Sequence, residues 1–116
     1  MLLRASGVTH NRDYDLNAVI GAAQSDPGVP HGRLLVEFAE AVVGEDEAAL
    51  TRARAALSEA IGPAGLADAA GVVGLFNAID RVADAAGIPL EAQKAEVSAD
   101  FRAALGVDRF DVATRT

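Results

Sequence analysis

The segment from Gly65 to Glu91 constrains the fold more than any other part of the chain. Apolar residues recur in it at steps of three and four, which is typical of an amphipathic helix that buries one broad face. They are Leu66, Ala70, Val73, Leu75, Phe76, Ile79, Val82, Ala83 and Ala86. Helix-breaking residues bound the segment, with Gly62 and Pro63 before it and Gly87 and Pro89 at its end. We therefore predict one helix of about twenty residues, roughly 30 Å long.

One side of this predicted helix carries only small residues, namely Ala67, Gly71, Gly74 and Ala78. Each glycine inside a helix costs about 1 kcal/mol relative to alanine, so two of them indicate a compensating gain. We expect another helix backbone to approach closely along this small-residue stripe, with neutral drift in an Ala/Gly-rich sequence as the alternative.

The polar side of the same helix carries Asp68, Asp80, Arg81 and Asp84, and Asn77 lies near the border with the apolar side. Asn77 and Arg81 are candidate binding residues, because an amide and a guanidinium can bind a ligand or a neighbouring subunit. A solvated face with local ion pairs explains the same residues, since such exposed pairs contribute only a few tenths of a kcal/mol.

The composition favours a small helical domain. Hydrophobic residues make up 51% of the 116 residues, but aromatic residues only 4%, and there is no tryptophan. A core made of many small contacts suits closely packed alanine-rich helices better than a β-sandwich, which favours β-branched and aromatic residues. The length suits one domain. We predict a single all-α domain over residues 1–116, folded as a compact bundle of about five helices.

The other elements follow from local signals. We expect four further helices, over residues 13–24, 29–43, 48–60 and 89–105. Asp13 is a plausible cap for the first of them, Pro30 fits the first turn of the second, and Gly44 and Gly106 are good terminating residues. Residues 1–12 are expected to be irregular. The tail over residues 106–116 keeps three apolar residues, which suggests that it docks, for example on a neighbouring subunit.

Charge and cysteine content exclude several classes of function. The net charge of -7 argues against binding to nucleic acid or to anionic lipid surfaces. There is no uniformly apolar run of about 18 residues and no signal peptide, so we expect a cytoplasmic protein with no membrane partner. Without cysteine there is no disulfide, thiolate metal site or thiol redox chemistry. The adjacent acids of residues 45–47 do not converge on one ion, so we expect no metal and no cofactor.

Several sequence phrases together resemble a known family. They are Leu34-Leu35, Phe38-Ala39-Glu40, Gly65-Leu66, Val72-Val73-Gly74-Leu75-Phe76-Asn77, Asp80-Arg81-Val82-Ala83-Asp84 and Gly87-Ile88-Pro89-Leu90. Over roughly residues 26–91 the chain resembles the alkylhydroperoxidase D-like and carboxymuconolactone decarboxylase superfamily, especially its peroxidase-related branch. The resemblance implies an all-helical, alkylhydroperoxidase D-like bundle that assembles into dimers, trimers or hexamers. It also implies a peroxide-reducing Cys-x-x-Cys helix, followed by a histidine, ahead of the helix that holds Leu34.

The chain departs from that family at the catalytic helix. It contains no cysteine, and it starts too late to hold that helix in full, as a truncated member would. A thiolate is the attacking atom in the family's peroxidase chemistry, so no catalytic residue carries over. The decarboxylase relatives work without the cysteine pair, but their catalytic positions have no match here.

Three functions remain open. The one that we favour is a non-catalytic, homo-oligomeric binding or assembly module. The second is a cysteine-independent decarboxylase or isomerase for a small organic substrate, with His31 as an acid–base group beside Arg33, Glu37 or Glu40. The spacing of those residues also fits ordinary helix salt bridges. The third is a subunit that completes a site with a separate partner chain.

Overall fold

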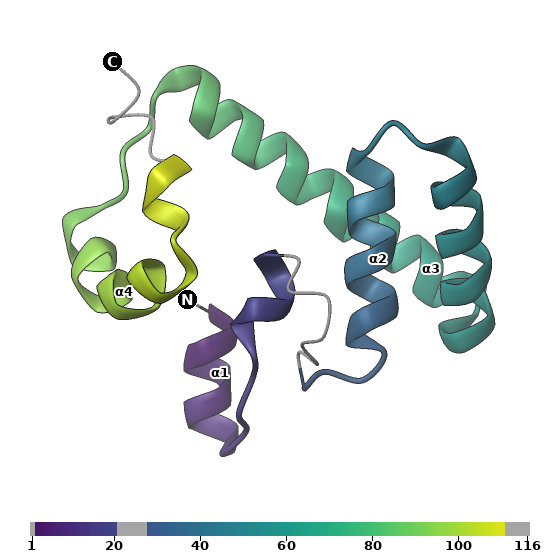
Figure 1. Cartoon of the computed structure of the whole chain (residues 1–116), viewed down its shortest axis with the longest axis horizontal. Coiled ribbons are helices and arrows are strands. Elements are labelled where there is room, and N and C mark those ends of the chain that lie inside the picture. Colours follow the sequence, from purple (N-terminus) through teal and green to yellow (C-terminus); the bar gives the residue numbers. More distant parts are fainter. Residues whose placement is uncertain (1, 21–27, 111–116) are drawn as a thin grey trace.

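The fold is that of a computed structural model, which describes residues 2–20 and 28–110 (Figure 1). Within these ranges the secondary structure is entirely helical, so the all-α prediction is confirmed. Four α-helices and two short 3-10 helices form, where about five helices were expected. They are α1 (Leu2–His10), η1 (Leu16–Ile20), α2 (Gly32–Val43), α3 (Glu47–Ala86), α4 (Ala92–Leu105) and η2 (Val107–Phe110).

The core lies where α2 packs against α3, with η1 beside α2. Phe38 of α2 and Leu57 of α3 are buried, with 3% and 0% of their surface exposed. Ala18 of η1 is the third buried hydrophobic residue in the described part of the chain. Such a small core fits a sequence poor in aromatic residues, since few side chains are large enough to fill space between helices.

Helix α3 has two arms that meet at a kink. Gly62 has φ 77° and ψ 171°, and Pro63 follows it. This backbone conformation is strained for residues other than glycine, and proline removes a helical hydrogen bond, so the direction of the helix changes here. We call residues 47–61 the first arm and residues 63–86 the second arm. The helix predicted over 48–60 and the one predicted after Gly65 are these two arms, joined without the intervening loop that was expected.

Several helix ends lie where the sequence placed them. The carboxylate oxygen Oδ1 of Asp46 accepts hydrogen bonds from the backbone N–H groups of Ala48 and Ala49, at 2.9 and 3.0 Å, and so caps α3. At the other end Gly87 is left-handed, with φ 64°. The N–H of Ile88 then donates to the carbonyl of Ala83 at 2.9 Å, which closes the helix in a Schellman turn. Gly44 and Gly106 end α2 and α4 as predicted.

The amino-terminal prediction was wrong. Residues 2–10 form α1 instead of irregular structure. Asn11 takes a left-handed conformation with φ 51°, and the N–H of Arg12 donates to the carbonyl of Gly7 at 2.8 Å. This bond closes the end of α1 and holds a short helix that hydrophobic periodicity does not reveal.

The helix predicted over residues 13–24 does not form in its described part. Only the 3-10 turn Leu16–Ile20 is present, and residues 21–24 lie outside the described ranges. Asp15, not Asp13, organises the turn, because its Oδ1 accepts from both the backbone and the side-chain nitrogen of Asn17, each at 2.9 Å. Side-chain bonds of this kind stabilise a turn in competition with a regular helix.

Two other helices begin later than predicted. Helix α2 starts at Gly32, because His31 is left-handed with φ 57° and cannot continue a helix backwards to Pro30. Helix α4 starts at Ala92, three residues after Pro89. Within the expected tail, residues 107–110 form η2, and residues 111–116 lie outside the described ranges.

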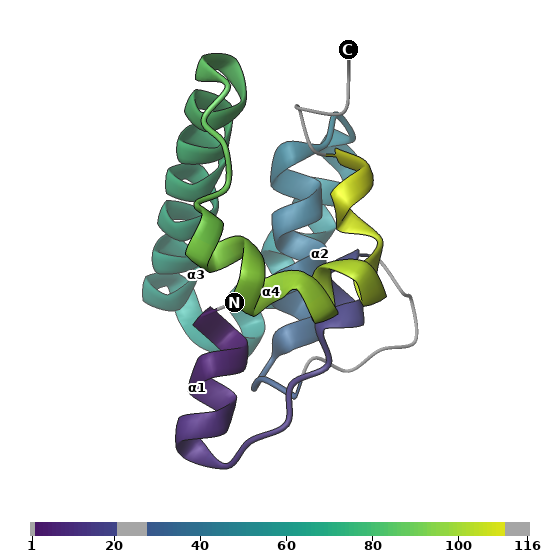
Figure 2. The same cartoon turned by 90° about the vertical axis from the view of Figure 1, so that its left-hand side faces the viewer.

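The molecule is more extended than a compact bundle of this size. The radius of gyration is 15.6 Å, where about 13 Å is typical of a 116-residue domain. The accessible surface is 8432 Å² for a chain of 11.9 kDa. A folded monomer of that mass exposes about 5,900 Å², so the chain exposes about 2,500 Å² more than expected. In Figure 2 the second arm of α3 stands along one edge of the molecule. The predicted compactness is therefore not found in the single chain.

Helix α3 is also long and apolar enough to cross a membrane, judged by length and composition alone. Its most apolar 18-residue window has a mean hydropathy of 1.2, and none of that window is buried. This is weak support for a membrane segment, but the expectation that the chain lacks one is not confirmed.

Candidate functional site

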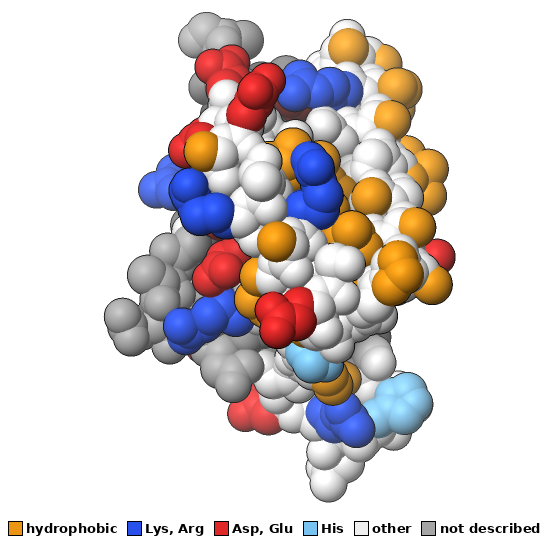
Figure 3. Space-filling view, turned by 90° about the vertical axis from the view of Figure 1, so that its right-hand side faces the viewer, with side chains coloured by type: hydrophobic (Ala, Val, Ile, Leu, Met, Phe, Trp, Pro, Cys, Tyr) orange, Lys and Arg blue, Asp and Glu red, His pale blue; other side chains and the backbone are white. Residues whose placement is uncertain are grey.

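The second arm of α3 presents a row of exposed, large hydrophobic side chains. We call these residues the α3 face: Val72, Leu75, Phe76, Ile79 and Val82. Each has more than half of its surface exposed, between 51% and 62%. In Figure 3 hydrophobic side chains gather along the edge of the molecule that α3 forms. Scattered hydrophobic residues are normal on a protein surface, but a contiguous apolar row indicates a contact surface.

The spacing of the α3 face explains why its members point the same way. Val72, Leu75, Ile79 and Val82 follow one another at steps of three, four and three. This is the spacing of a helix seam that packs against one other helix. Phe76 lies beside the seam, next to Leu75. Within the described chain α3 packs mainly on α2, and no described element packs comparably on the α3 face.

The small-residue stripe lies along one flank of the α3 face. Ala67, Gly71, Gly74 and Ala78 are all exposed. A Cβ atom built on Gly71 or Gly74 would meet no other atom within 4 Å. The close packing that the sequence predicted along this stripe is therefore absent within the single chain, and a contact between chains stays a prediction.

The two candidate binding residues on the polar side bind each other. Arg81 Nε donates to Asn77 Oδ1 at 3.0 Å, one helical turn apart. Arg81 is exposed and Asn77 is half-buried. This geometry agrees with the interpretation of a solvated helix side with local bonds, which the sequence left open.

The four candidate acid–base residues are not gathered in one pocket, since Glu37 and Glu40 do not share a hollow with His31 and Arg33. His31 and Arg33 are exposed and line a shallow hollow at the start of α2. Glu37 lines a different hollow, between α2 and the first arm of α3. The side chain of His31 makes no capping hydrogen bond to α2. General acid–base catalysis needs such groups to converge on one substrate, so this arrangement does not favour the decarboxylase or isomerase alternative.

The hollow between α2 and α3 is lined by more acidic than basic residues, and one of the acidic residues, Asp46, already caps α3. Glu37, Glu40, Glu45, Asp46 and Arg52 line it. The backbone N–H of Ala49 lowers the pKa of Asp46 below its ordinary value of 3.8; desolvation opposes this shift, and the N–H of Ala48 and the charge of Arg52 add to it. Among the described residues no group of three or more His, Cys, Asp or Glu side chains is placed to hold a metal ion.

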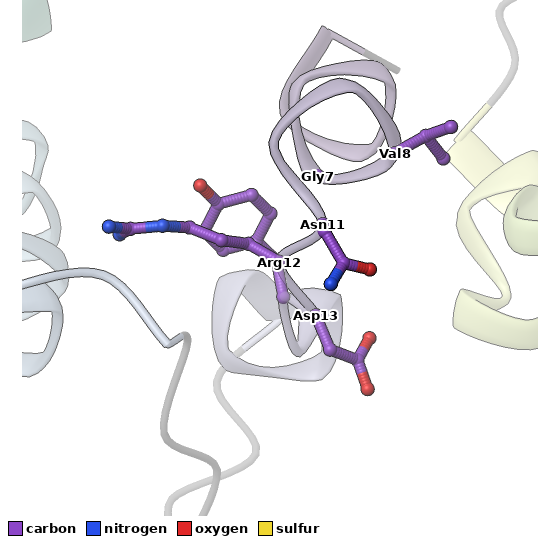
Figure 4. Close-up of a pocket in the computed structure, with 6 residues that line it drawn as sticks. Gly7, Val8, Asn11, Arg12 and Asp13 are labelled. Atoms are coloured by element: carbon purple, nitrogen blue, oxygen red, sulfur yellow. The ribbon is translucent and has the colours of Figure 1, made fainter.

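A further hollow lies at the end of α1, where the chain turns (Figure 4). Gly7 is buried there, and a Cβ atom on it would come within 2.5 Å of the carbonyl oxygen of Arg12. The side chains of Arg12 and Asp13 point in different directions in Figure 4, and Val8 is 81% exposed. We interpret this hollow as the closing turn of α1, because its polar groups do not converge.

Sequence reasoning missed one polar cluster, which ties α4 to η2. Arg102 Nε donates to Ser98 Oγ at 2.9 Å, and Arg102 Nη2 donates to the carbonyl of Ala95 at 2.9 Å. The same guanidinium forms an ion pair with Asp108. Ser98 is buried and donates to the carbonyl of Lys94 at 2.6 Å. The spacing of Ser98 and Arg102, four residues apart on one helix, was the only signal for this cluster. Its role is structural, because its groups are engaged with one another.

Comparison of the chain with protein-family models, with curated proteins and with solved structures finds no match. The family resemblance therefore remains a prediction. Of the features described, the α3 face is the one whose geometry is suited to a function, and the function that it suits is contact with another apolar surface.

Proposed function

We propose that this protein is a non-catalytic helical assembly module of the alkylhydroperoxidase D-like kind. It associates with another protein chain through the α3 face. The observation that carries the proposal is the exposed row of large hydrophobic side chains on the second arm of α3, which no described element of the chain covers.

The energetics support a contact role. Burying apolar surface contributes about 25 cal/mol per Å², and the five side chains of the α3 face are each more than half exposed. The core is small in comparison: Ala18, Phe38 and Leu57 are the buried hydrophobic residues among those whose side chains the structure describes. A chain that leaves its larger apolar row in water gains stability when a partner covers that row.

The chemistry supports a non-catalytic role. The chain has no cysteine, so the thiolate attack that the resemblance implies for the peroxidase branch has no nucleophile here. His31 and Arg33 line a different hollow from the one that Glu37 lines. Purified protein should therefore show no peroxidase turnover with a hydroperoxide and a dithiol. Turnover that follows the protein through further purification would contradict the non-catalytic part of the proposal.

Site-specific photocrosslinking in cells tests the contact role directly. A photoreactive phenylalanine analogue replaces Ile79 in one variant and Arg81 in a matched control variant. Ile79 lies on the α3 face, and Arg81 lies two residues away on the polar side of the same helix. We expect a discrete protein adduct from position 79 and little or none from position 81, whether the adduct is a second copy or another protein. Equal yields at the two positions, or no protein adduct at position 79, would overturn the proposal.

A further inference from the structure

We propose that the partner on the α3 face is a second copy of this chain, packed antiparallel so that the second arms of the two α3 helices lie against each other. This inference rests on the proposed contact role of the α3 face and adds the identity and direction of the partner.

Summed over the whole chain, of which the α3 face is one part, the exposed surface leaves room for a subunit contact. The chain exposes about 2,500 Å² beyond the surface of a folded monomer of 11.9 kDa. Obligate homodimers bury about 2,000 to 5,000 Å² in total, or about 1,000 to 2,500 Å² on each copy. A short peptide bound to one helix covers much less. Ile88 and Leu90, which are 61% and 52% exposed, extend the apolar surface past the end of α3.

The α3 face is complementary to itself when one copy is reversed. Val72 then lies opposite Val82 of the other copy, and Leu75 lies opposite Ile79. The same two pairs occur again on the other side of the twofold axis, because in a twofold contact both copies use the same surface. Every seam position therefore meets a large apolar side chain, with none left over. The axis passes level with position 77, midway between Leu75 and Ile79 along the helix.

Asp68 decides between the two possible directions. It lies four residues before Val72, so it is on the same side of the helix as the seam and not on the polar side, where we expected it. In a parallel pair the two Asp68 carboxylates face each other in an apolar contact, and like charges at such a position are costly. In the antiparallel pair Asp68 lies opposite Ala86, at the edge of the contact. In the antiparallel pair the two helix dipoles also point in opposite directions, which is the more favourable arrangement.

The flanks of the seam fit the same arrangement. On one flank, Phe76 of each copy meets Phe76 of the other near the twofold axis. On the other flank, Gly71 and Ala78 carry small or no side chains, so the two backbones approach closely there. Two of the four residues of the small-residue stripe thus gain the role that the single chain does not provide.

A lipid bilayer is the other apolar environment that could cover α3, and the sequence of the helix disfavours it. The mean hydropathy of the best window is only 1.2. That part of the chain includes Asp68, and Asp80 and Arg81 follow on the polar side of the arm. Charged side chains inside a bilayer cost several kcal/mol each. The net charge of -7 also opposes binding to anionic lipids.

Cysteine crosslinking of the purified full chain tests both the identity and the direction of the partner. Since the chain has no cysteine, each introduced cysteine is the only thiol present. Three single variants are made, Val72→Cys, Val82→Cys and Arg81→Cys, and Val82→Cys carries a short tag so that dimers separate on a gel. Oxidation of mixed Val72→Cys and Val82→Cys should give several-fold more mixed dimer than either variant gives with itself, since a disulfide needs closely opposed Cβ atoms. Arg81→Cys should stay uncrosslinked.

Four results would overturn the inference. Strong self-crosslinking of Val72→Cys and of Val82→Cys, with little mixed product, indicates a parallel pair. Crosslinking of Arg81→Cys at the same yield indicates random collision. A monomeric wild-type mass with co-sedimentation on phosphatidylcholine–phosphatidylglycerol vesicles indicates a lipid partner. A monomer that still gives an adduct with a different protein from position 79 in cells overturns the second copy while leaving the proposed contact role intact.

Discussion

Asp46 and Arg102 show how single polar residues hold this sparsely packed chain together. Asp46 satisfies two free N–H groups at the start of α3, and Arg102 joins α4 to η2 through Ser98, Ala95 and Asp108. With only three buried hydrophobic residues among those whose burial the structure describes, such contacts carry a larger share of the stability than they do in a well-packed domain.

Two substitutions distinguish the capping hydrogen bonds of Asp46 from the effect of its negative charge. Asp46→Ala should lower the melting temperature by a few degrees, because no side chain then accepts from Ala48 and Ala49. Asp46→Asn should lose much less, since asparagine caps helices about as well as aspartate. Circular dichroism melts at pH 7 measure both. Equal losses in the two variants would show that the charge, and not the cap, is what matters.

The pH dependence of the cap follows from the sign of its pKa shift. The pKa of Asp46 is lowered in the folded chain, chiefly by the N–H of Ala49, so the folded state favours the ionised carboxylate. Its stabilising contribution is fully present above the ordinary value of 3.8 and is lost as the pH falls through the lower folded value. The stability difference between wild type and Asp46→Asn should therefore be constant from pH 7 to about pH 5 and change only at more acid pH.

Residue-level signals in the sequence predicted the ends of elements better than their starts. Gly44, Gly87 and Gly106 follow helix ends as expected. Gly87 and Gly106 are left-handed, a conformation that favours glycine, whereas Gly44 is extended. The starts depended on which of several polar side chains binds the backbone. Asp15 rather than Asp13 does so, and the two are indistinguishable by residue type. The hydrogen bond between Ser98 and Arg102 was missed because its contribution to stability depends on the burial of Ser98, and burial is determined by packing.

At the scale of elements, the kink in α3 determines where the second arm goes. Gly62 has φ 77° and ψ 171°, in a region that is essentially restricted to glycine. Gly62→Ala should lower the free energy of unfolding by about 1–3 kcal/mol through backbone strain, although a Cβ atom there meets nothing within 4 Å. Chemical denaturation followed by circular dichroism measures the loss. An unchanged or increased stability would show that the kink does not have this conformation in solution.

Glycines in the second arm should behave in the opposite way. Gly74→Ala replaces a helical glycine in open space, so it should stabilise the helix by about 0.5–1 kcal/mol and leave self-association unchanged. Gly71→Ala gives the same helix gain, but adds a methyl group on the flank of the proposed dimer seam and should weaken self-association. Denaturation and sedimentation equilibrium of the two variants measure these effects. Equal dimer affinities in the two variants would contradict the placement of Gly71 at the contact.

The amphipathic pattern of α3 correctly predicts a helix, but it wrongly predicts that the apolar side of this helix is buried within the chain. Periodicity shows that one side of a helix is apolar and needs cover; it does not show whether the cover comes from the same chain or from another. Leu75, Phe76 and Ile79 are therefore exposed here although their spacing predicts a buried side. The Gly62–Pro63 pair was read as a loop between two helices, because the sequence does not show that one residue suffices for the bend.

At the scale of the whole molecule, the chain leaves several large hydrophobic side chains exposed. Its surface exceeds that of a monomer of its mass by about 2,500 Å², and its exposed hydrophobic residues include a continuous row on α3. The composition predicted helices, which are found, and a core of many small contacts; the buried residues instead include the large side chains of Phe38 and Leu57. It could not predict that the large hydrophobic side chains of the α3 face are exposed, since that depends on the path of α3 after its kink.

The solution mass of the wild-type chain, compared with that of Ile79→Asp, tests this account most directly. Sedimentation equilibrium at micromolar concentration should give twice the chain mass of 11.9 kDa for the wild type. Ile79→Asp places a carboxylate in the apolar seam and should return the mass of one chain, while the control Arg81→Asp on the polar side should remain dimeric. A wild type that sediments as one chain at every concentration, or an Ile79→Asp variant that stays dimeric, would contradict the account.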